Sequence, residues 1–487
     1  KSAIITAEVN GAMEELLDEF SRTFKADHVV WDLLQPTSLQ SAAEAVYGTK
    51  GVPQYRFDKA EVIVNFGADF LETWISPCEY ARGWSKARKA KKPVRVIQIE
   101  PRLSLTGANA DLWLSPKPGT EIHLAAALLK SILDLGYGPK YKDALDKIVG
   151  KVNLADVSQK TGIALSKITV VAQYLHDSKS SLVLAGGTAS SGSNSYEIGL
   201  IVNFINLVLG NVGKTVFPSR SRSSRTSIAK LKQVIADLNN DEIDLLMVYE
   251  TNPAFTLPSS YGFKYAMKRA VHSVSFSSHM DETTELADLI LPSHTFLESW
   301  GDQRTFDGIY SLQQPVMTPL FKTKAFADSL LTAAEQAGKK ISSESGSDFR
   351  SYLKDSWKKL YSKFRAEANA DFETFWEQSL ERGGYFSFAD PAKDNNGSTP
   401  DPAALKFKLE PLQFADSSDA AEDIIVYPYP SVKSFDGRAA NRPWMQELPD
   451  PITQVVWDSW AEINPKLLKQ KDWLREMWLQ SEIIMEK

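Results

Sequence analysis

The sequence has little of what most metal centres and disulfide frameworks need, because it contains a single cysteine, Cys78, in 487 residues. One thiol excludes an internal disulfide, a cysteine-rich zinc site and a four-cysteine iron–sulfur cluster on this chain. The histidines show no spacing typical of metal ligands; they are His28, His123, His176, His272, His279 and His294. We therefore predict no metal site built from these residue types.

Long apolar runs and an excess of positive charge are also missing. The longest apolar run, Ile198–Leu209, carries Asn203 and Asn206 and is too short and too polar to cross a bilayer. The net charge of −6 argues against a general nucleic-acid binder. Lys1–Asn10 does not have the pattern of a secretory signal peptide. Nothing resembles the GxGxxG dinucleotide fingerprint, and no Ser/His/Asp triad can be assigned from chain order, because triads are defined by geometry.

What the sequence does contain is a repeated alternation of apolar strands and amphipathic helices, in a chain long enough for two or three domains. Near-continuous apolar strands separated by helices favour an α/β fold with doubly wound, mostly parallel sheets. The strands we predict are Ser2–Ala7, His28–Leu34, Glu61–Phe66, Val94–Ile99, Ser181–Leu184 and Asp241–Tyr249, and the helices are Met13–Phe24, Ser38–Tyr47, Ile122–Leu135 and Tyr196–Leu209.

Val271–Asp302 has the pattern of one strand–helix–strand unit of a parallel sheet. Val271–Phe276 and Leu286–Leu291 are the two apolar strands, and Asp281 is placed to cap the short helix between them. Ligands of open α/β sheets bind beyond the carboxyl ends of the strands. The loops where we expect a site, unless they are ordinary surface loops, are Ser277–Asp281 and Pro292–Asp302.

A glycine- and serine-rich stretch, Gly186–Ser193, lies between a predicted strand and a predicted helix. Such glycines let backbone amides approach an anion, and a helix N-terminus favours negative charge. Gly187 and Gly192 have the spacing of a phosphate loop, but Ser193 stands where that motif needs lysine, so a nucleotide triphosphatase is excluded. A phosphate cradle and a tight strand-to-helix turn fit the pattern equally well.

The texture of the sequence changes in two places. Pro218–Ser227 is a short basic, serine-rich stretch that we interpret as a solvated loop. Beyond Lys339 the chain becomes aromatic-rich, and we predict helices over Asp348–Leu380, a linker at Asp390–Asp401, a strand at Ile424–Tyr429 and an ordered docking segment at Asp436–Pro451. Trp457, Trp460, Trp473 and Trp478 mark either a partner surface or packing onto their own domain.

We divide the chain accordingly. Residues 1–25 are a strand and a helix that complete the second α/β domain, and residues 26–217 form the first α/β domain. A loop and helix at 218–240 connect to the second α/β domain at 241–330. Residues 331–487 are a helical and irregular docking region with a Trp-rich C-terminus.

The strongest indication of function comes from five segments taken in their order along the chain. They are Ile63–Pro77, Ile99–Glu121, Leu184–Asn194, Val248–Ala254 and Asp281–Asp302. Together they resemble the two central α/β domains of the molybdopterin oxidoreductase superfamily. Ser311–Phe321 and Asp436–Pro465 are further similar to the large iron–sulfur subunit of bacterial alternative complex III, a membrane quinol:cytochrome c (or electron-acceptor) oxidoreductase.

The resemblance implies that these loops correspond to those that hold two pyranopterin dinucleotides in active members of the superfamily. The residues that would line the cleft by position are Gly67, Ala68, Asp69, Glu100, Pro101, Arg102, Gly186, Gly187, Thr188, Asn252, Pro253, Asp281, Glu282, Thr283, Thr284 and Asp288.

This sequence departs from the active members where the metal would be bound. Trp31–Ser41 corresponds to the loop that supplies the metal ligand, yet it has no cysteine; Gln35 falls near the ligand position, and Ser38 and Ser41 are only nominal substitutes. Glu100 stands where aspartate is usual. We also expect no N-terminal cluster segment and no C-terminal barrel, with a helix at Lys466–Lys487.

The resemblance therefore implies a scaffold that has lost its metal, with no catalytic residue, cofactor or metal of its own. It would lie on the periplasmic side of the bacterial inner membrane without a membrane span. Its expected partners are an iron–sulfur cluster domain, a multihaem cytochrome c subunit and an integral-membrane quinol-oxidising subunit, which would carry the iron–sulfur clusters and c-type haems.

One alternative is a bis-pterin molybdenum reductase of the polysulfide or dimethyl-sulfoxide type, with Ser38 or Ser41 on the metal. The other is a partner-binding remnant with no respiratory role.

Overall fold

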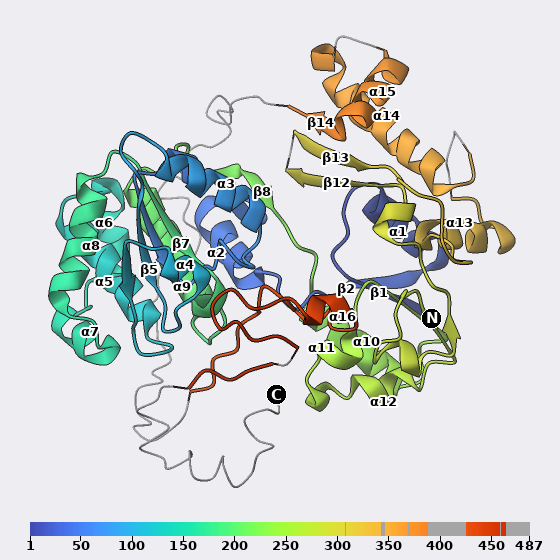
Figure 1. Cartoon of the computed structure of the whole chain (residues 1–487), viewed down its shortest axis with the longest axis horizontal. Coiled ribbons are helices and arrows are strands. Elements are labelled where there is room, and N and C mark those ends of the chain that lie inside the picture. The colour runs from blue at the N-terminus through green and yellow to red at the C-terminus, as the bar shows by residue number, and fades with distance from the viewer. Residues whose placement is uncertain (307, 342–345, 369–370, 388–424, 458, 464–487) are drawn as a thin grey trace, which may run out of the picture.

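The computed structural model describes residues 1–306, 308–341, 346–368, 371–387, 425–457 and 459–463. It contains two α/β units, one around a four-stranded sheet and one around a five-stranded sheet. A helical unit adjoins the second sheet, and the segment coloured red runs between the two α/β units (Figure 1). Every strand pair in the two large sheets is parallel, so the predicted α/β fold with mostly parallel sheets is confirmed.

The first sheet has the strand order β6-β5-β4-β7. Every residue of β4 and β7 is buried, which explains their unbroken apolar sequence, because helices cover both faces of such a sheet. The strands are β4 (Val62–Phe66), β5 (Arg95–Ile99), β6 (Leu112–Leu114) and β7 (Ser181–Ala185), and the helices are α2 (Thr37–Tyr47), α3 (Pro77–Arg88), α4 (Leu105–Ala108), α5 (Glu121–Asp134), α6 (Lys142–Val149), α7 (Leu154–Thr161), α8 (Leu165–Asp177) and α9 (Ser195–Val208).

The second sheet has the order β11-β10-β9-β1-β2 and is made from two distant parts of the chain. Along β1, Ile4 enters one apolar cluster while Ala3 and Ile5 enter another, so helices pack on both faces. Its strands are β1 (Ser2–Thr6), β2 (Ala26–Val30), β9 (Leu245–Tyr249), β10 (His272–Ser275) and β11 (Leu289–Ile290), and its helices are α1 (Ala12–Phe24), α10 (Ile228–Asn239), α11 (Pro253–Thr256) and α12 (Phe263–Met267).

The structure differs from the sequence prediction at two boundaries. β2 lies in the second sheet rather than in the first domain, because it pairs with β1 along its whole length, from Ser2–Ala26 to Thr6–Val30. The stretch we interpreted as a solvated loop, Pro218–Ser227, begins within β8 (Val216–Arg222), which pairs antiparallel with β3 (Val52–Tyr55). Its basic residues are engaged: Arg222 donates to Glu79 over 3.2 Å, and its guanidinium lies 4.5 Å from the centre of the Phe306 ring.

The helical unit confirms the helices predicted near 348–380. It consists of α13 (Phe326–Gln336), α14 (Phe349–Ala368) and α15 (Phe372–Arg382), beside an antiparallel sheet of β12 (Gly301–Phe306), β13 (Ile309–Gln313) and β14 (Gly384–Phe386). Trp357 is fully buried, and its indole N–H donates to Asp302 Oδ2 over 3.1 Å. Asp302 also accepts the Ala12 N–H over 2.7 Å, so one buried carboxylate joins α14 and β12 to the start of α1.

The C-terminal part of the described chain is mostly irregular. The predicted strand near 424–429 is wrong, since residues 425–430 form no strand. The docking segment predicted at 436–451 has turns and one short helix, α16 (Pro443–Gln446). The predicted linker at Asp390–Asp401, the helix at Lys466–Lys487 and the tryptophans Trp473 and Trp478 lie outside the described residues. Among the helices that the structure describes, none combines the length and apolarity needed to cross a membrane.

The buried amide of Asn206, in the apolar helix α9, pairs with the backbone of β7. Its Nδ2 donates to the Val183 carbonyl over 2.7 Å, and its Oδ1 accepts the Val183 N–H over 3.1 Å. The side chain therefore pairs with the outer edge of β7 as a neighbouring strand would, and satisfies two buried backbone groups that otherwise lack partners.

Replacing Asn206 by alanine should lower the free energy of unfolding by about 3 kcal/mol, because it leaves the Val183 N–H and C=O unpaired in the core. Urea titration monitored by circular dichroism measures this loss. Asn203→Ala, one turn earlier on the same helix, is the matched control and should cost clearly less. Equal losses in the two variants would contradict this account of Asn206.

Candidate functional site

The loops beyond the carboxyl ends of both sheets face a common space, and that space contains part of the chain itself. Residues 425–457 and 459–463, which we call the strap, run between the two α/β units (Figure 1). Each contact between the strap and the predicted site residues therefore bears on what the site can hold.

Two glycine-bearing turns of the first unit pack directly on each other. Gly67 directly follows β4 and has a φ of 72°, and a Cβ added there would lie 2.7 Å from the Ala189 N. A Cβ on Gly187 would collide with the Gly67 carbonyl oxygen, and one on Gly186 would collide with the indole of Trp74. Glycine is required at these positions because neighbouring backbone and the Trp74 indole of the same protein lie too close to allow a side chain. Of the two interpretations of this stretch, the structure supports the tight turn rather than the phosphate cradle.

A buried row of polar side chains crosses β4 and β5 and ends at Glu100. Asn65 donates to Gln98 over 2.7 Å, and Gln98 donates to Glu100 Oε2 over 2.9 Å. The other oxygen of Glu100 accepts the Ser104 N–H and hydroxyl over 2.9 and 2.7 Å. Both carboxyl oxygens thus have partners within the protein, and burial raises the pKa of Glu100.

Two more carboxyl groups lie close to Glu100. Asp69 is buried and accepts the N–H and hydroxyl of Thr73, and burial raises its pKa. Glu72 accepts the Leu105 N–H over 3.1 Å. Burial, and next the negative charge of Asp69, raise the pKa of Glu72 to about 7. This edge of the first sheet is therefore rich in buried acid groups, which offer no positive charge to an anionic ligand.

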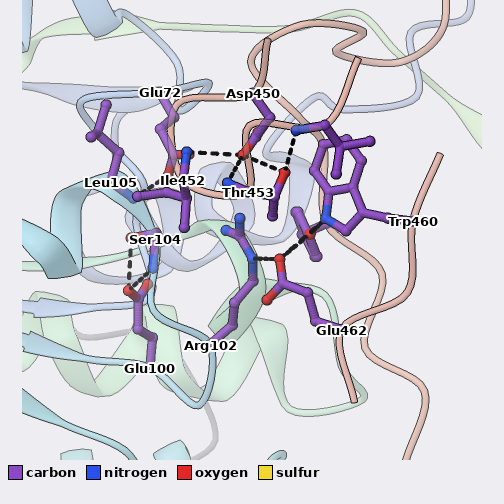
Figure 2. A network of polar contacts seen from close by, with 12 residues as sticks. Glu72, Glu100, Arg102, Ser104, Leu105, Asp450, Ile452, Thr453, Trp460 and Glu462 are labelled. Carbon is purple, nitrogen blue, oxygen red and sulfur yellow. Dashed lines mark hydrogen bonds and ion pairs between the residues drawn. The ribbon is translucent and has the colours of Figure 1, made fainter. Parts of the chain in front are cut away.

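Arg102 is the basic residue among these carboxyls, and the strap binds it. Its guanidinium lies 3.6 Å from the centre of the Tyr429 ring, and its Nε donates to Glu462 over 3.2 Å. Trp460 donates its indole N–H to the Tyr429 hydroxyl over 2.6 Å, which fixes the ring. Figure 2 shows the strap side chains gathered over the loops that carry Glu72, Glu100 and Arg102.

The loops of the second sheet form their own hydrogen-bonded network. Asn252 donates to Glu282 over 2.7 Å and accepts the Thr283 hydroxyl over 2.6 Å. Asp281 Oδ1 accepts the N–H groups of Thr283 and Thr284 over 3.1 and 2.8 Å. It therefore hydrogen-bonds to the start of the short 3₁₀ helix η5 (Thr284–Leu286), although Thr283 and not Asp281 stands at the N-cap position. Here the structure brings the predicted residues of β9 and β10 together.

The structure does not bring Asp288 to this network. Asp288 precedes β11, and its carboxylate accepts the N–H and hydroxyl of Ser273 over 2.8 and 2.7 Å near the start of β10. It therefore lies at the amino ends of the strands, at the edge of the sheet opposite Asn252, and its assignment to the cleft is wrong. The remaining predicted residues follow their strands: Ala68 follows β4, Pro101 follows β5, Thr188 lies in the short helix Gly187–Ser190, and Pro253 begins α11.

The loop proposed to supply a metal ligand offers no prepared site. Ser38 hydrogen-bonds to the Ser195 hydroxyl over 3.0 Å, and Ser41 is exposed on α2. The Gln35 carbonyl accepts the Thr37 N–H over 2.9 Å. Within the part of the chain that the structure describes, no group of three or more His, Cys, Asp or Glu side chains could hold a metal ion.

The strap also contacts the second unit. Arg438 donates from Nη2 to Asp32 over 3.2 Å and to Asp436 over 2.6 Å. Asn441 donates to the Met280 carbonyl over 3.4 Å, and Gly437 approaches the Phe255 ring so closely that a Cβ would lie 2.6 Å from it. A small cavity of about 30 Å³ lies between Asp32, Glu250, Phe255 and the strap.

These strap contacts are the part of the site that sequence reasoning missed. Tyr429 and Glu462 contact Arg102 across more than 300 residues of chain, and no periodic pattern marks them. The one signal in the sequence was the irregular composition of residues 436–451, which indicated an ordered docking segment but not its target.

Comparison with known proteins identifies the fold and the family. A family model described as molybdopterin oxidoreductase matches residues 22–327, well over half of the chain. The chain belongs to the molybdopterin oxidoreductase family. Acetylene hydratase from Pelobacter acetylenicus has a similar fold, with a TM-score of 0.57 and 12% sequence identity over 69% of this chain and 55% of that one.

Two curated relatives show how far the similarity extends within this molybdopterin oxidoreductase family. The molybdopterin-binding-like subunit of menaquinone reductase from Nitratidesulfovibrio vulgaris is 28% identical over 69% of this chain and 52% of its own length. The catalytic subunit of assimilatory nitrate reductase from Bacillus subtilis is 23% identical over 45% of this chain and 38% of its own. The chain thus spans about half, or less, of the length of these relatives.

The raised pKa of Glu72 predicts how stability depends on pH. The Glu72 carboxyl has a pKa of about 7 in the folded protein, against an ordinary value of 4.5 in the unfolded chain. The folded protein therefore binds this proton more tightly, and the free energy of unfolding falls as pH rises from about 4.5 to about 7. Glu72→Gln removes that loss and should be more stable than the parent by about 2 kcal/mol at pH 8 but not at pH 4. Urea titrations at both pH values measure this, with the exposed Glu44→Gln as control.

Loss of the Arg102 side chain should loosen the strap. Arg102→Gln removes an aromatic contact and an ion pair to a mostly buried guanidinium, so the strap should detach about tenfold more often. Limited proteolysis followed by mass spectrometry measures the rate of cleavage within the strap. Arg269→Gln breaks an exposed ion pair with Asp241 elsewhere and is the control. An unchanged cleavage rate in Arg102→Gln would show that this residue does not hold the strap.

Proposed function

We propose that this chain is a pterin-free scaffold of a membrane-associated respiratory quinol:electron-acceptor oxidoreductase of the alternative complex III type. One observation carries the proposal: the strap occupies the space between the carboxyl ends of the two sheets, where the resemblance places a pair of pterin dinucleotides. Electron transfer then belongs to neighbouring subunits, and this chain supplies surfaces against which they assemble.

Steric contacts support this role. The Gly67 and Gly187 turns pack on each other, and Trp74 packs against Gly186. On the side of the second sheet, Gly437 and Arg438 of the strap lie against Phe255 and Asp32. A dinucleotide lying across these strand ends would have to displace the strap from both units at once.

The charges support the same conclusion. The phosphates of a dinucleotide need cationic or N–H partners. The loops at the carboxyl ends of the first sheet instead present three buried carboxyl groups, those of Asp69, Glu72 and Glu100. Two arginines of this region are already paired, Arg102 with Glu462 and Arg438 with Asp32 and Asp436. The residues present therefore do not fit the group, and we derive no chemical step through it.

The partners follow from the resemblance and from the relative named as a subunit of menaquinone reductase. We propose that the chain lies on the periplasmic side of the inner membrane, against an iron–sulfur cluster domain, a multihaem cytochrome c subunit and an integral-membrane quinol-oxidising subunit. In such an assembly it holds no catalytic residue.

Metal and pterin analysis tests the proposal. The chain is produced with its neighbours in a host that makes the molybdenum cofactor, and molybdenum, tungsten and released pterin are measured per chain. We expect all three to be far below one per chain, while c-type haem co-purifies with the complex.

Stoichiometric metal and pterin would overturn the proposal in favour of a bis-pterin reductase, and loss of the metal in Ser38→Ala or Ser41→Ala would then identify the ligand. Metal-free protein that never co-purifies with haem or a membrane subunit would instead indicate a partner-binding remnant without a respiratory role.

A further inference from the structure

Two loops beside the edge strand β11 present large apolar side chains to solvent. One loop follows β11 and contains the short helix η6 (Phe296–Glu298), and the other follows β13 over residues 314–324. The exposed fractions are 68% for Phe296, 41% for Leu297, 76% for Val316, 71% for Leu320 and 78% for Phe321. We call these five residues the apolar tip.

Hydrogen bonds hold the two loops together, so the apolar tip is one patch. Val316 N donates to the Leu297 carbonyl over 2.9 Å, and Leu320 N donates to Glu298 Oε1 over 2.9 Å. Thr295 and Glu298 form a capping box that fixes η6. These contacts define the backbone of both loops while their apolar side chains point away from it, an arrangement typical of a surface that meets a partner.

We propose that the apolar tip inserts into the interfacial region of an anionic phospholipid bilayer. The proposal deepens, and rests on, the membrane-associated role proposed above. All members of the apolar tip except Leu297 have side chains that are two-thirds or more exposed, so they protrude from the surface instead of lining a groove. A protruding apolar group suits a bilayer, which deforms around it, better than it suits a preformed flat protein surface.

The charges beside the apolar tip match phospholipid headgroups. Lys322 directly follows Phe321 and is exposed, and Lys324 lies two residues further on. The one acidic side chain over residues 291–299 and 311–324 is Glu298, and its carboxylate accepts the N–H groups of Thr295 and Leu320. Neither bond of Glu298 involves a lysine. Lys322 can therefore meet lipid phosphates, and Lys324, whose Nζ donates one hydrogen bond to Thr332 over 2.6 Å, keeps two further donors for them while the apolar side chains enter the acyl boundary.

Vesicle co-sedimentation of the full chain tests the proposal. We expect binding to vesicles of phosphatidylethanolamine and phosphatidylglycerol, and weaker binding to phosphatidylcholine vesicles. The double variant Leu320→Ser, Phe321→Ser should bind at least about tenfold more weakly, because two large side chains no longer enter the bilayer. The control Tyr265→Ser, Val271→Ser changes residues that are 81% and 61% exposed outside the two loops, and it should bind as the parent does.

A second readout detects insertion itself. The chain has one cysteine, so Cys78→Ser combined with Phe321→Cys allows a single environment-sensitive fluorophore to be attached at the apolar tip. Its emission should shift to the blue with anionic vesicles, and the same label at Tyr265→Cys should not shift. Circular dichroism of each variant checks that these exposed substitutions leave the fold intact.

Absence of vesicle binding, or equal binding by the loop variant and its control, overturns the proposal. If the loop variant instead loses a protein subunit from the purified complex without any vesicle binding by the parent, the patch is a protein interface and the bilayer proposal is wrong. Metal and pterin content does not enter these measurements, so their failure is distinct from failure of the pterin-free role.

Discussion

Two parallel sheets that face each other with their carboxyl ends create a space lined by polar loop ends, and the buried groups among them need hydrogen-bond partners. In this protein the strap supplies them. Arg102 lies between the ring of Tyr429 and the carboxylate of Glu462, and Arg438 joins the strap to Asp32. The strap thereby connects loops that belong to different sheets, and it adds to the contacts that β8 makes with β12.

The glycines of this site illustrate how one residue type can satisfy different requirements. In a cofactor-binding protein, glycine permits a phosphate to approach the backbone. Here Gly186 and Gly187 permit the approach of Trp74 and of the Gly67 carbonyl. The same glycine pattern therefore occurs where another part of the protein, and not a ligand, lies against the backbone. A glycine pattern cannot by itself distinguish a ligand site from tight internal packing.

Much of the fold could be predicted because buried parallel strands have a strong local signature. β4 and β7 are apolar at nearly every position, and Asp281 accepts N–H groups that lie only two and three residues further along the chain. β2 was misplaced because strand partners depend on contacts that sequence periodicity does not encode. β8 was missed because its serines and arginines look solvated, although Arg222 is held by Glu79 and Phe306.

The site was only partly predictable for a related reason. Position in a family motif correctly grouped Asn252, Asp281 and Thr283, which lie on consecutive carboxyl-end loops. The same reasoning misplaced Asp288. It lies only a few residues beyond Asp281–Thr284 in the sequence, but it precedes the two-residue strand β11 and therefore stands at the opposite edge of the sheet. The strap could not be placed at all, since an irregular segment carries no period from which a partner hundreds of residues away can be read.

The order of strands in the second sheet has a consequence for biosynthesis. β1 lies between β2 and β9, and its register joins Ser2 to Leu245, so the first α/β unit is nested within the sequence of the second. During synthesis β1 and β2 leave the ribosome before the nested unit and β9, so one side of β1 stays unpaired while the nested unit is completed. Only the later emergence of β9 closes that open edge, which makes the first unit the part able to mature independently and the second the one exposed to mispairing in the interval.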